Sequence, residues 1–192
     1  MSKRIAFFTA AAFGALALTA TVVAPVSAQD KMKSEMSGEK TVMVGGAAMF
    51  PSKNIIQNAV NSKDHTTLVA AVKAAGLVGT LEGKGPFTVF APTNAAFGKL
   101  PAGTVDTLVK PENKATLTKI LTYHVVPGKL EASDLTDGKK LKTVQGEELT
   151  VKRSGDKVMI IDAKGDSSTV TIPNVNQSNG VIHVVDTVLM PS

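Results

Sequence analysis

The sequence predicts an α+β fold, because helical and strand patterns are concentrated in different halves of the chain. Between residues 54 and 123, apolar side chains recur mostly at the three- and four-residue spacing of amphipathic helices. From residue 141 onward, apolar and polar side chains alternate as they do in strands. No repeat unit is present. Segregated helices and strands of this kind are typical of one α+β domain.

The first 28 residues have the features of a secretory signal peptide. A short basic start (Lys3 and Arg4) precedes an uncharged, largely apolar run over residues 5–24, and small residues follow at positions 26–28. The polar and small residues near its end favour cleavage after Ala28 over retention as a membrane anchor. The style of this segment predicts a bacterial protein exported to the periplasm or the extracellular medium.

The exported part is expected to consist of a disordered linker, residues 29–40, and one folded domain, residues 41–192. The linker is polar, lysine- and serine-rich and without apolar periodicity. The chain has no cysteine, so neither a disulfide nor a lipoprotein anchor is available. Its 43% hydrophobic content can form one ordinary core. The formal charge is +5, but the lysines are scattered, which excludes the basic patch of a nucleic-acid-binding protein.

Order is expected to begin near residues 42–50, followed by a short helix over residues 54–60. Asp64 is expected to cap the next helix, and Gly76 to end it. The apolar stripe of that helix comprises Leu68, Val72 and Ala75. A helical turn at 104–109 is expected before another helix, which begins after Pro111. The stripe of this last helix comprises Leu117, Ile120 and Leu121.

The second half of the domain predicts strands. Residues 149–151 and 158–161 flank Ser154-Gly155-Asp156, which has the composition of a hairpin turn. A further strand over 170–172 is expected to end at Pro173. Residues 181–189 are apolar on both faces, which predicts a central strand covered on each side.

Three segments carry a resemblance to a known family. Residues 87–97 (FTVFAPTNAAF) predict a buried strand, broken at Pro92 and turned by Thr93-Asn94 into a short helix whose Phe97 folds onto the core. Residues 121–128 (LTYHVVPG) and 179–191 (NGVIHVVDTVLMP) follow in order. In these segments the chain resembles the fasciclin-like domain family. The resemblance implies a wedge-shaped β-sandwich with several helices packed along it.

The resemblance also implies a function, because members of this family are mostly secreted or envelope adhesion modules and not enzymes. In animal relatives a tyrosine–histidine element has been tied to adhesion, including integrin binding, and Tyr123 and His124 match it. These two residues are therefore the predicted binding site. The alternative is that both rings only lock a strand to a helix, with the phenol reaching a buried acceptor.

The sequence gives little sign of a metal or cofactor site. His124 and His183 are expected to be buried and satisfied by local hydrogen bonds, while His65 is expected to be solvated in the first turn of a helix. No two histidines have the spacing of metal ligands, so no cofactor is predicted. The thioethers of Met32, Met36, Met43 and Met49 could hold Cu(I), but their spacing fixes no geometry.

Catalytic motifs are not found either. The chain has no cysteine nucleophile, no Gly-x-Ser-x-Gly and no His-Glu-x-x-His. Glu147 and Glu148 are adjacent on an expected strand and should point to opposite faces, which does not suit a paired-carboxylate site. Lys164-Gly165-Asp166 matches an integrin-recognition tripeptide, but a Gly-containing turn is expected there in any case.

The resulting hypothesis is a non-catalytic adhesion or interaction module whose partner is an envelope or extracellular protein or polysaccharide. No nucleic-acid partner and no membrane anchor after signal cleavage are expected. Two alternatives remain open. The first is a periplasmic carrier of a small ligand or of copper, which needs an apolar pocket between helices and sandwich or convergent ligands. The second is a hydrolase, which needs a hydroxyl nucleophile beside His124 or His183 in a cleft.

Overall fold

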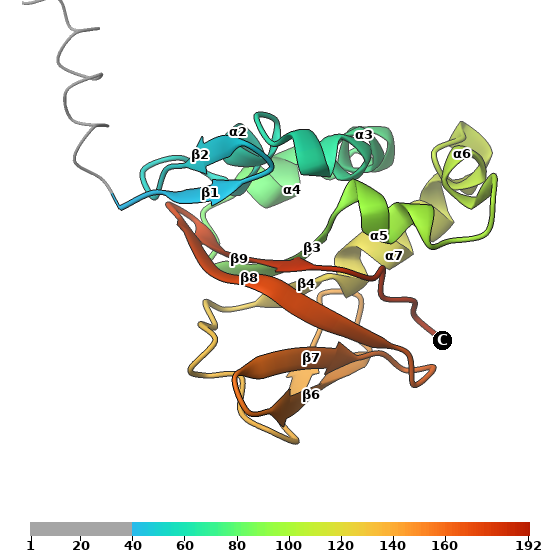
Figure 1. Ribbon diagram of the computed structural model, residues 1–192. Coiled ribbons are helices and arrows are strands. Elements are labelled where there is room, and N and C mark those ends of the chain that lie inside the picture. The colour runs from blue at the N-terminus through green and yellow to red at the C-terminus, as the bar shows by residue number, and fades with distance from the viewer. Residues whose placement is uncertain (1–39) are drawn as a thin grey trace, which may run out of the picture.

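The computed structural model describes residues 40–192, so the predicted signal peptide and linker lie outside the described residues (Figure 1). Its helices are α2 (Ile55–Ala59), α3 (Thr66–Ala75), α4 (Val78–Glu82), α5 (Asn94–Gly98), α6 (Thr104–Leu108) and α7 (Lys114–Tyr123), with 3-10 turns η1 (Lys63–His65) and η2 (Pro111–Asn113). Its strands are β1 (Val42–Val44), β2 (Ala47–Met49), β3 (Phe87–Pro92), β4 (Val125–Pro127), β5 (Lys140–Lys142), β6 (Glu148–Ser154), β7 (Lys157–Ile161), β8 (Ser167–Gln177) and β9 (Gly180–Val185). Helices precede most of the strands, which confirms the α+β prediction.

Two helix ends are fixed by local residues, and the start of α3 is held by a distant side chain. Asn54 caps α2 through Gln57 N, and Gly76 ends α3 in the left-handed conformation, as expected. The cap predicted at Asp64 is wrong, because Asp64 lies in η1 and α3 starts only at Thr66. Asn94, from the segment after β3, accepts a hydrogen bond from Thr67 N at 3.0 Å instead. The start of α3 is thus held by a residue 27 positions away.

The strands form a seven-stranded sheet in the order β4-β3-β9-β8-β7-β6-β5, with β1 and β2 in a separate hairpin. β3 and β9 are parallel, and every other neighbouring pair is antiparallel. The sheet curls until its ends meet, since Val144 N, just after β5, donates to Val125 O in β4 at 2.8 Å. The curled sheet has two facing layers, which is the sandwich that the resemblance implied (Figure 1).

β8 and β9 differ in length from the prediction. β8 does not end at Pro173 but continues to Gln177, because its pairing with β9 shifts register between Ile172 and Val175. Such an irregularity accommodates a proline, which has no N–H to donate to the ladder. β9 ends at Val185, short of the expected Leu189. All six of its residues are buried, which confirms a central strand covered on both faces.

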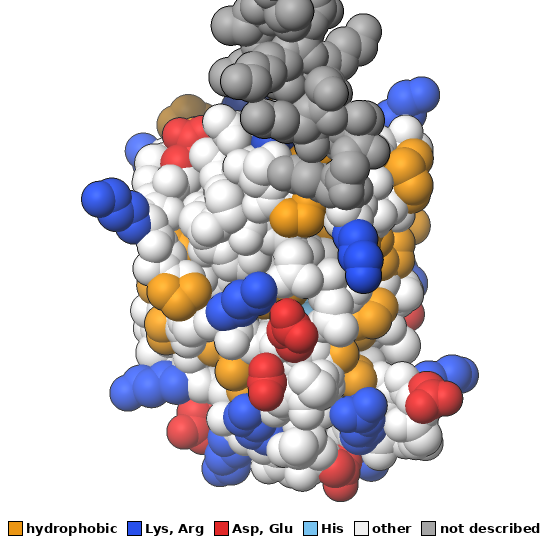
Figure 2. All heavy atoms as spheres, turned by 90° about the vertical axis from the view of Figure 1, so that its left-hand side faces the viewer, with side chains coloured by type: hydrophobic (Ala, Val, Ile, Leu, Met, Phe, Trp, Pro, Cys, Tyr) orange, Lys and Arg blue, Asp and Glu red, His pale blue; other side chains and the backbone are white. Residues whose placement is uncertain are grey.

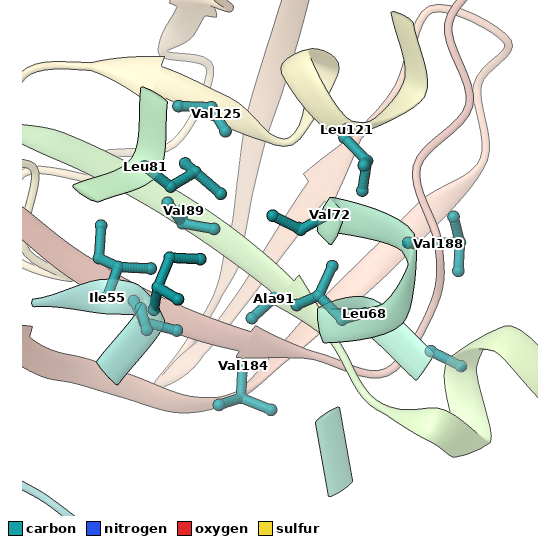
Figure 3. Packing of buried hydrophobic residues seen from close by; sticks show 14 of the residues in the cluster. Ile55, Leu68, Val72, Leu81, Val89, Ala91, Leu121, Val125, Val184 and Val188 are labelled. Carbon is teal, nitrogen blue, oxygen red and sulfur yellow. The ribbon is translucent and has the colours of Figure 1, made fainter. Parts of the chain in front are cut away.

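Two hydrophobic clusters lie on the two sides of β3 and β9. The first cluster lies between the sheet and the helices (Figure 3) and includes Leu68, Val72, Val89 and Ile182. The second lies between the sheet layers and contains Phe90, Tyr123, Leu149 and Ile160. Because successive side chains of a strand point to opposite faces, β3 and β9 contribute residues to both clusters. Within residues 40–192, no helix is both long enough and apolar enough to span a lipid bilayer.

Candidate functional site

The predicted binding residues lie at the carboxyl end of α7, where the chain turns into β4. Tyr123 is the last residue of the helix, and His124 follows as its C-cap. The stripe of α7 packs onto the first core and leaves Tyr123 directed into the second. The relative exposure of Tyr123 is 0% and that of His124 is 3%. Neither side chain reaches the surface.

The phenol of Tyr123 connects α7 to the opposite sheet layer. Its oxygen accepts a hydrogen bond from Ala163 N at 2.8 Å and lies 3.4 Å from the carbonyl oxygen of Glu148, to which the hydroxyl donates. Burial raises the pKa of this phenol above its usual value. The hydroxyl therefore stays protonated and can serve both contacts, which is the buried-acceptor arrangement considered from the sequence.

The imidazole of His124 joins α7 to the C-terminal segment. Nδ1 donates to the carbonyl of Ile120 at 2.9 Å, which leaves Nε2 to accept from Leu189 N at 3.0 Å. These partners fix one neutral tautomer. Desolvation lowers the pKa of His124 to about 4, so the ring is neutral near pH 7.

Asp162 completes this network and was not predicted from the sequence. One carboxylate oxygen accepts from Lys164 N at 3.0 Å and Asp166 N at 2.9 Å, and the other accepts from Met190 N at 3.0 Å. The carboxylate thus folds the β7–β8 turn and ties it to the C-terminal segment. An aspartate two residues before a Lys-Gly dipeptide is compatible with such an Asx turn, and this was the available sequence signal.

The turn held by Tyr123 and Asp162 comprises residues 163–166, and it is exposed along its whole length. Gly165 has a φ of +90°, which glycine adopts without strain. The Lys164-Gly165-Asp166 tripeptide is therefore displayed on a braced turn. In Figure 1 this turn and the C-terminus lie at the same end of the molecule.

The binding role of Tyr123 and His124 stays a prediction, and the geometry limits the form that it can take. Both side chains are buried and engaged with backbone groups, so a partner at the surface cannot touch them directly. What they can do is position two segments: the turn 163–166, through Tyr123, and the C-terminal segment after Val188, through His124. A binding role for the pair in this fold is therefore one of positioning.

Of the predictions for the other two histidines, the one for His183 is confirmed and the one for His65 is wrong. His183 is fully buried, with Nε2 at 2.8 Å from the carbonyl oxygen of Leu130 and Nδ1 accepting from Asn174 N at 3.3 Å. His65, expected to be solvated, is only 3% exposed. The prediction failed because α3 starts one residue later than expected, which turns the ring of His65 inward beside Ser62.

The described residues do not assemble the other candidate sites. Among residues 40–192, no three His, Asp or Glu side chains converge in the manner of a metal site. Met43 lies opposite Ala48 in the β1–β2 hairpin, so Met43 (59% exposed) and Met49 (3% exposed) lie on opposite faces and their thioethers do not converge either. Glu147 pairs with Lys119 and Glu148 with Lys140, which separates the two carboxylates. Their predicted opposite orientation is consistent with these contacts.

Asn179 is a second buried hub that the sequence analysis did not identify. Its side-chain oxygen accepts from Ile55 N at 3.1 Å, and its amide donates to Leu81 O at 2.7 Å and Gly83 O at 2.9 Å. One side chain thus fastens α2 and α4 to the start of β9. An Asn-Gly dipeptide before a strand predicts a turn, but it does not predict these distant partners.

Comparisons with known proteins agree with this architecture. The family model of the fasciclin domain matches residues 63–191. The solved structure of a FAS1 domain pair from the insect cell adhesion molecule fasciclin I is similar, with a TM-score of 0.66 and 18% sequence identity. That likeness covers 79% of this chain and 58% of the solved one, and at this identity it supports the fold alone.

Bacterial relatives are closer in sequence. Protein sll1483 of Synechocystis sp. is 46% identical over 190 residues, which is 99% of this chain and 97% of the relative. The immunogenic protein MPB70 of Mycobacterium bovis is 35% identical and matches 100% of this chain and 98% of its own. The cell surface glycolipoprotein MPB83 of the same species is 40% identical over 153 residues, covering 77% of this chain and 64% of the relative. The chain belongs to the fasciclin domain family.

Proposed function

We propose that this protein is an exported, non-catalytic interaction module of the fasciclin type, which recognises an envelope or extracellular protein or polysaccharide. Its recognition surface is the exposed turn 163–166 together with the residues of the adjoining C-terminal segment that are not buried, Asp186, Thr187, Met190 and Ser192. The observation that carries this proposal is the pair of hydrogen bonds from Ala163 N to Tyr123 and from Leu189 N to His124. Two buried rings thus hold the backbone of the exposed turn and of the C-terminal segment beside it.

Pre-organisation is what makes this surface suitable for recognition. A partner that binds a flexible loop must overcome the entropy of ordering it, whereas a braced turn has already lost that freedom. Asp162 provides two further backbone hydrogen bonds within the turn. Lys164 and Asp166 then present opposite charges at a fixed location, which favours a polar or charged partner.

The face shown in Figure 2 offers less for a partner to recognise than the braced turn does. On the face shown in Figure 2, charges of both signs are interspersed and apolar side chains occur in small separate groups. Single exposed apolar residues are normal on a folded domain. A fixed, charged turn therefore distinguishes the opposite end of the molecule.

The comparisons and the leader support export and a role at the cell surface. One relative is described as a cell surface glycolipoprotein, and the similar solved structure comes from a cell adhesion molecule. Residues 1–28 have the composition of a signal peptide. The non-catalytic character is supported by His124 and His183, whose ring nitrogens all contact backbone atoms and not a hydroxyl nucleophile.

A binding experiment on two hairpin turns tests the proposal. The purified protein is immobilised and exposed to solubilised envelope and extracellular matrix of the source organism. Lys164→Ala/Asp166→Ala removes the two charges of the recognition turn. Asp156→Ala/Lys157→Ala removes the same pair of charges from the exposed β6–β7 turn and serves as the matched control.

Loss of a retained component with the first variant and not with the second supports the proposed surface. Equal retention by both variants and the wild type would move recognition away from this turn. If the wild type itself retains nothing from either extract, the adhesion function is contradicted. Circular dichroism of both variants at the same temperature ensures that the comparison is made between folded proteins.

A further inference from the structure

An apolar cavity lies between the helices and the sheet, at the place where a small-ligand carrier would need one. Its volume is about 40 Å³, and its walls come from helices α2, α3, α4 and α7 with η1, from the β1–β2 hairpin, and from strands β3, β4, β8 and β9. Among the lining residues are Ile55, Leu68, Val72, Leu81, Val89 and Leu121, whose side chains are drawn in Figure 3. Core packing normally leaves few voids larger than one water molecule, so a space of this size is unusual.

Two polar side chains, His65 and His124, line this otherwise apolar space, and both ring nitrogens of His124 already bond backbone groups. His65 is 3% exposed, and its Nδ1 lies 2.9 Å from the hydroxyl oxygen of Ser62. Its other ring nitrogen, Nε2, has no hydrogen-bond partner within residues 40–192. A buried polar atom without a partner costs about 1–3 kcal/mol, so this atom calls for an explanation.

The contact with Ser62 indicates that the free nitrogen of His65, Nε2, carries the ring proton. In the described part of the chain, no other acceptor takes the Ser62 hydroxyl proton, so this hydroxyl donates to Nδ1. The neutral ring then carries its proton on Nε2. The Ala91 carbonyl favours a proton on the ring, but burial outweighs it and lowers the pKa of His65 below its usual value. Nε2 is therefore an N–H donor without an acceptor of good geometry.

We propose that the cavity binds a small neutral ligand with an apolar body and one acceptor oxygen, which takes the hydrogen bond from His65 Nε2. A site of this kind combines apolar walls with one orienting polar group, as ligand pockets in proteins do. Since one water needs about 10–15 Å³, the volume fits about three non-hydrogen atoms. Benzene occupies a cavity of about 150 Å³, so aromatic rings are excluded by size. The site is independent of the proposed recognition turn.

Ethanol is a suitable probe, because it has three non-hydrogen atoms and one oxygen. We expect a saturable titration in NMR spectra of the full protein, in which the methyl signals of Val72 and Leu68 and the Nε2–H signal of His65 shift together. tert-Butanol has the same hydroxyl chemistry with a larger body and is expected to cause no saturable shift. Shifts that are absent, or that grow linearly for both alcohols, would overturn the proposal.

Two variants separate the roles of the nitrogen and of the space. His65→Phe keeps a ring but removes Nε2, and it should weaken ethanol binding about tenfold, as expected for one lost hydrogen bond. Unchanged affinity in this variant would refute the role of His65. Val72→Ile reduces the cavity by one methyl group, which leaves too little room for the three non-hydrogen atoms of ethanol while His65 stays in place, and it should abolish the saturable shift. Val184→Ile adds the same group to a buried residue that does not line the cavity, and it should leave binding unchanged.

Discussion

The hydroxyl oxygen of Tyr123 and the backbone nitrogen of Ala163 lie 2.8 Å apart, although 40 positions separate the two residues in the chain. The first residue ends a helix of the helical layer, and the second starts an exposed turn of the sheet. A single buried side chain therefore determines where a surface segment sits.

Tyr123→Phe removes the acceptor of Ala163 N and leaves the ring in the core. We expect the free energy of unfolding to fall by about 1 kcal/mol, the usual value of one hydrogen bond. Hydrogen exchange at the Ala163 amide should become about tenfold faster, because the turn opens more easily. Thr118→Val removes a hydroxyl that bonds only an exposed helix carbonyl and is the control. An Ala163 amide that exchanges equally in wild type and variant would contradict the positioning role.

Asn179→Asp replaces a buried amide donor with a carboxylate that faces the carbonyl oxygens of Leu81 and Gly83. The free energy of unfolding should fall by about 3–5 kcal/mol at pH 7, because a buried charge is left without a partner. In Asn61→Asp the same change affects an exposed amide that donates to Gln57 O. Urea denaturation should show a loss below about 1 kcal/mol for this control. Similar losses in both variants would contradict the hub role of Asn179.

Gly180→Ala introduces a methyl group where the β3 backbone passes very close. A Cβ at this position would stand 2.0 Å from the carbonyl oxygen of Phe87, and backbone cannot move aside as a side chain can. We expect a loss of at least about 3 kcal/mol in thermal or urea unfolding. Gly155→Ala, in the β6–β7 turn, meets no atom within 4 Å and is strained only by its φ of +59°. Its cost should be about 1 kcal/mol, so equal costs would refute the steric argument.

Acid should destabilise the protein through its histidines. His124 has a pKa of about 4 in the folded state and an ordinary value of 6.5, so between these two values only the unfolded state takes up the proton. Stability is therefore complete above about pH 6.5 and is lost as the pH falls, by about 1.4 kcal/mol per pH unit and about 3 kcal/mol in total. The lowered pKa values of His65 and His183 act in the same direction.

Urea denaturation between pH 7 and pH 4 measures this effect, and NMR titration assigns it. His124→Asn keeps an amide N–H near the position of Nδ1 but cannot titrate. Between pH 6.5 and pH 4, its free energy of unfolding should therefore fall by about 1.4 kcal/mol per pH unit less than that of the wild type. A folded His124 that titrates near pH 6.5 would contradict the prediction. So would a wild-type stability that is constant between pH 6.5 and pH 4.

Much of the fold was accessible from the sequence because its determinants are local. Gly76 ends α3, Thr93 caps α5 through Ala96 N, and the turn at Gly155 joins β6 to β7, each as its residue type predicts. What failed depends on contacts across the fold. Asn94 provides the N-terminal contact of α3 in place of Asp64, and Pro173 is tolerated because β9 pairs across an irregularity in β8. Neither partner can be identified from local periodicity.

The binding role of Tyr123 and His124 stays a prediction; their shielding could be anticipated from the sequence, but the segments that they position could not. The resemblance drew attention to Tyr123 and His124, and the apolar stripe of α7 predicted that His124 would be shielded. Asp162 was overlooked because a lone aspartate near a turn is common. Its role in joining the turn to the C-terminal segment depends on a hydrogen bond from Met190 N, 28 positions later. The inward direction of the His65 ring likewise depends on the residue at which α3 begins. Sequence patterns do not locate a helix boundary to within one residue, so this direction could not be predicted.

The hydrogen bond between Val144 and Val125 affects the tendency of the protein to aggregate at high concentration. An open sheet presents unpaired N–H and C=O groups at its edge strands, which can template fibrils or strand exchange between molecules. Here the two end strands, β4 and β5, have three residues each, and the hydrogen bond from Val144 N to Val125 O joins the two ends. The sheet thereby offers little template for aggregation, a useful property for a protein without disulfides.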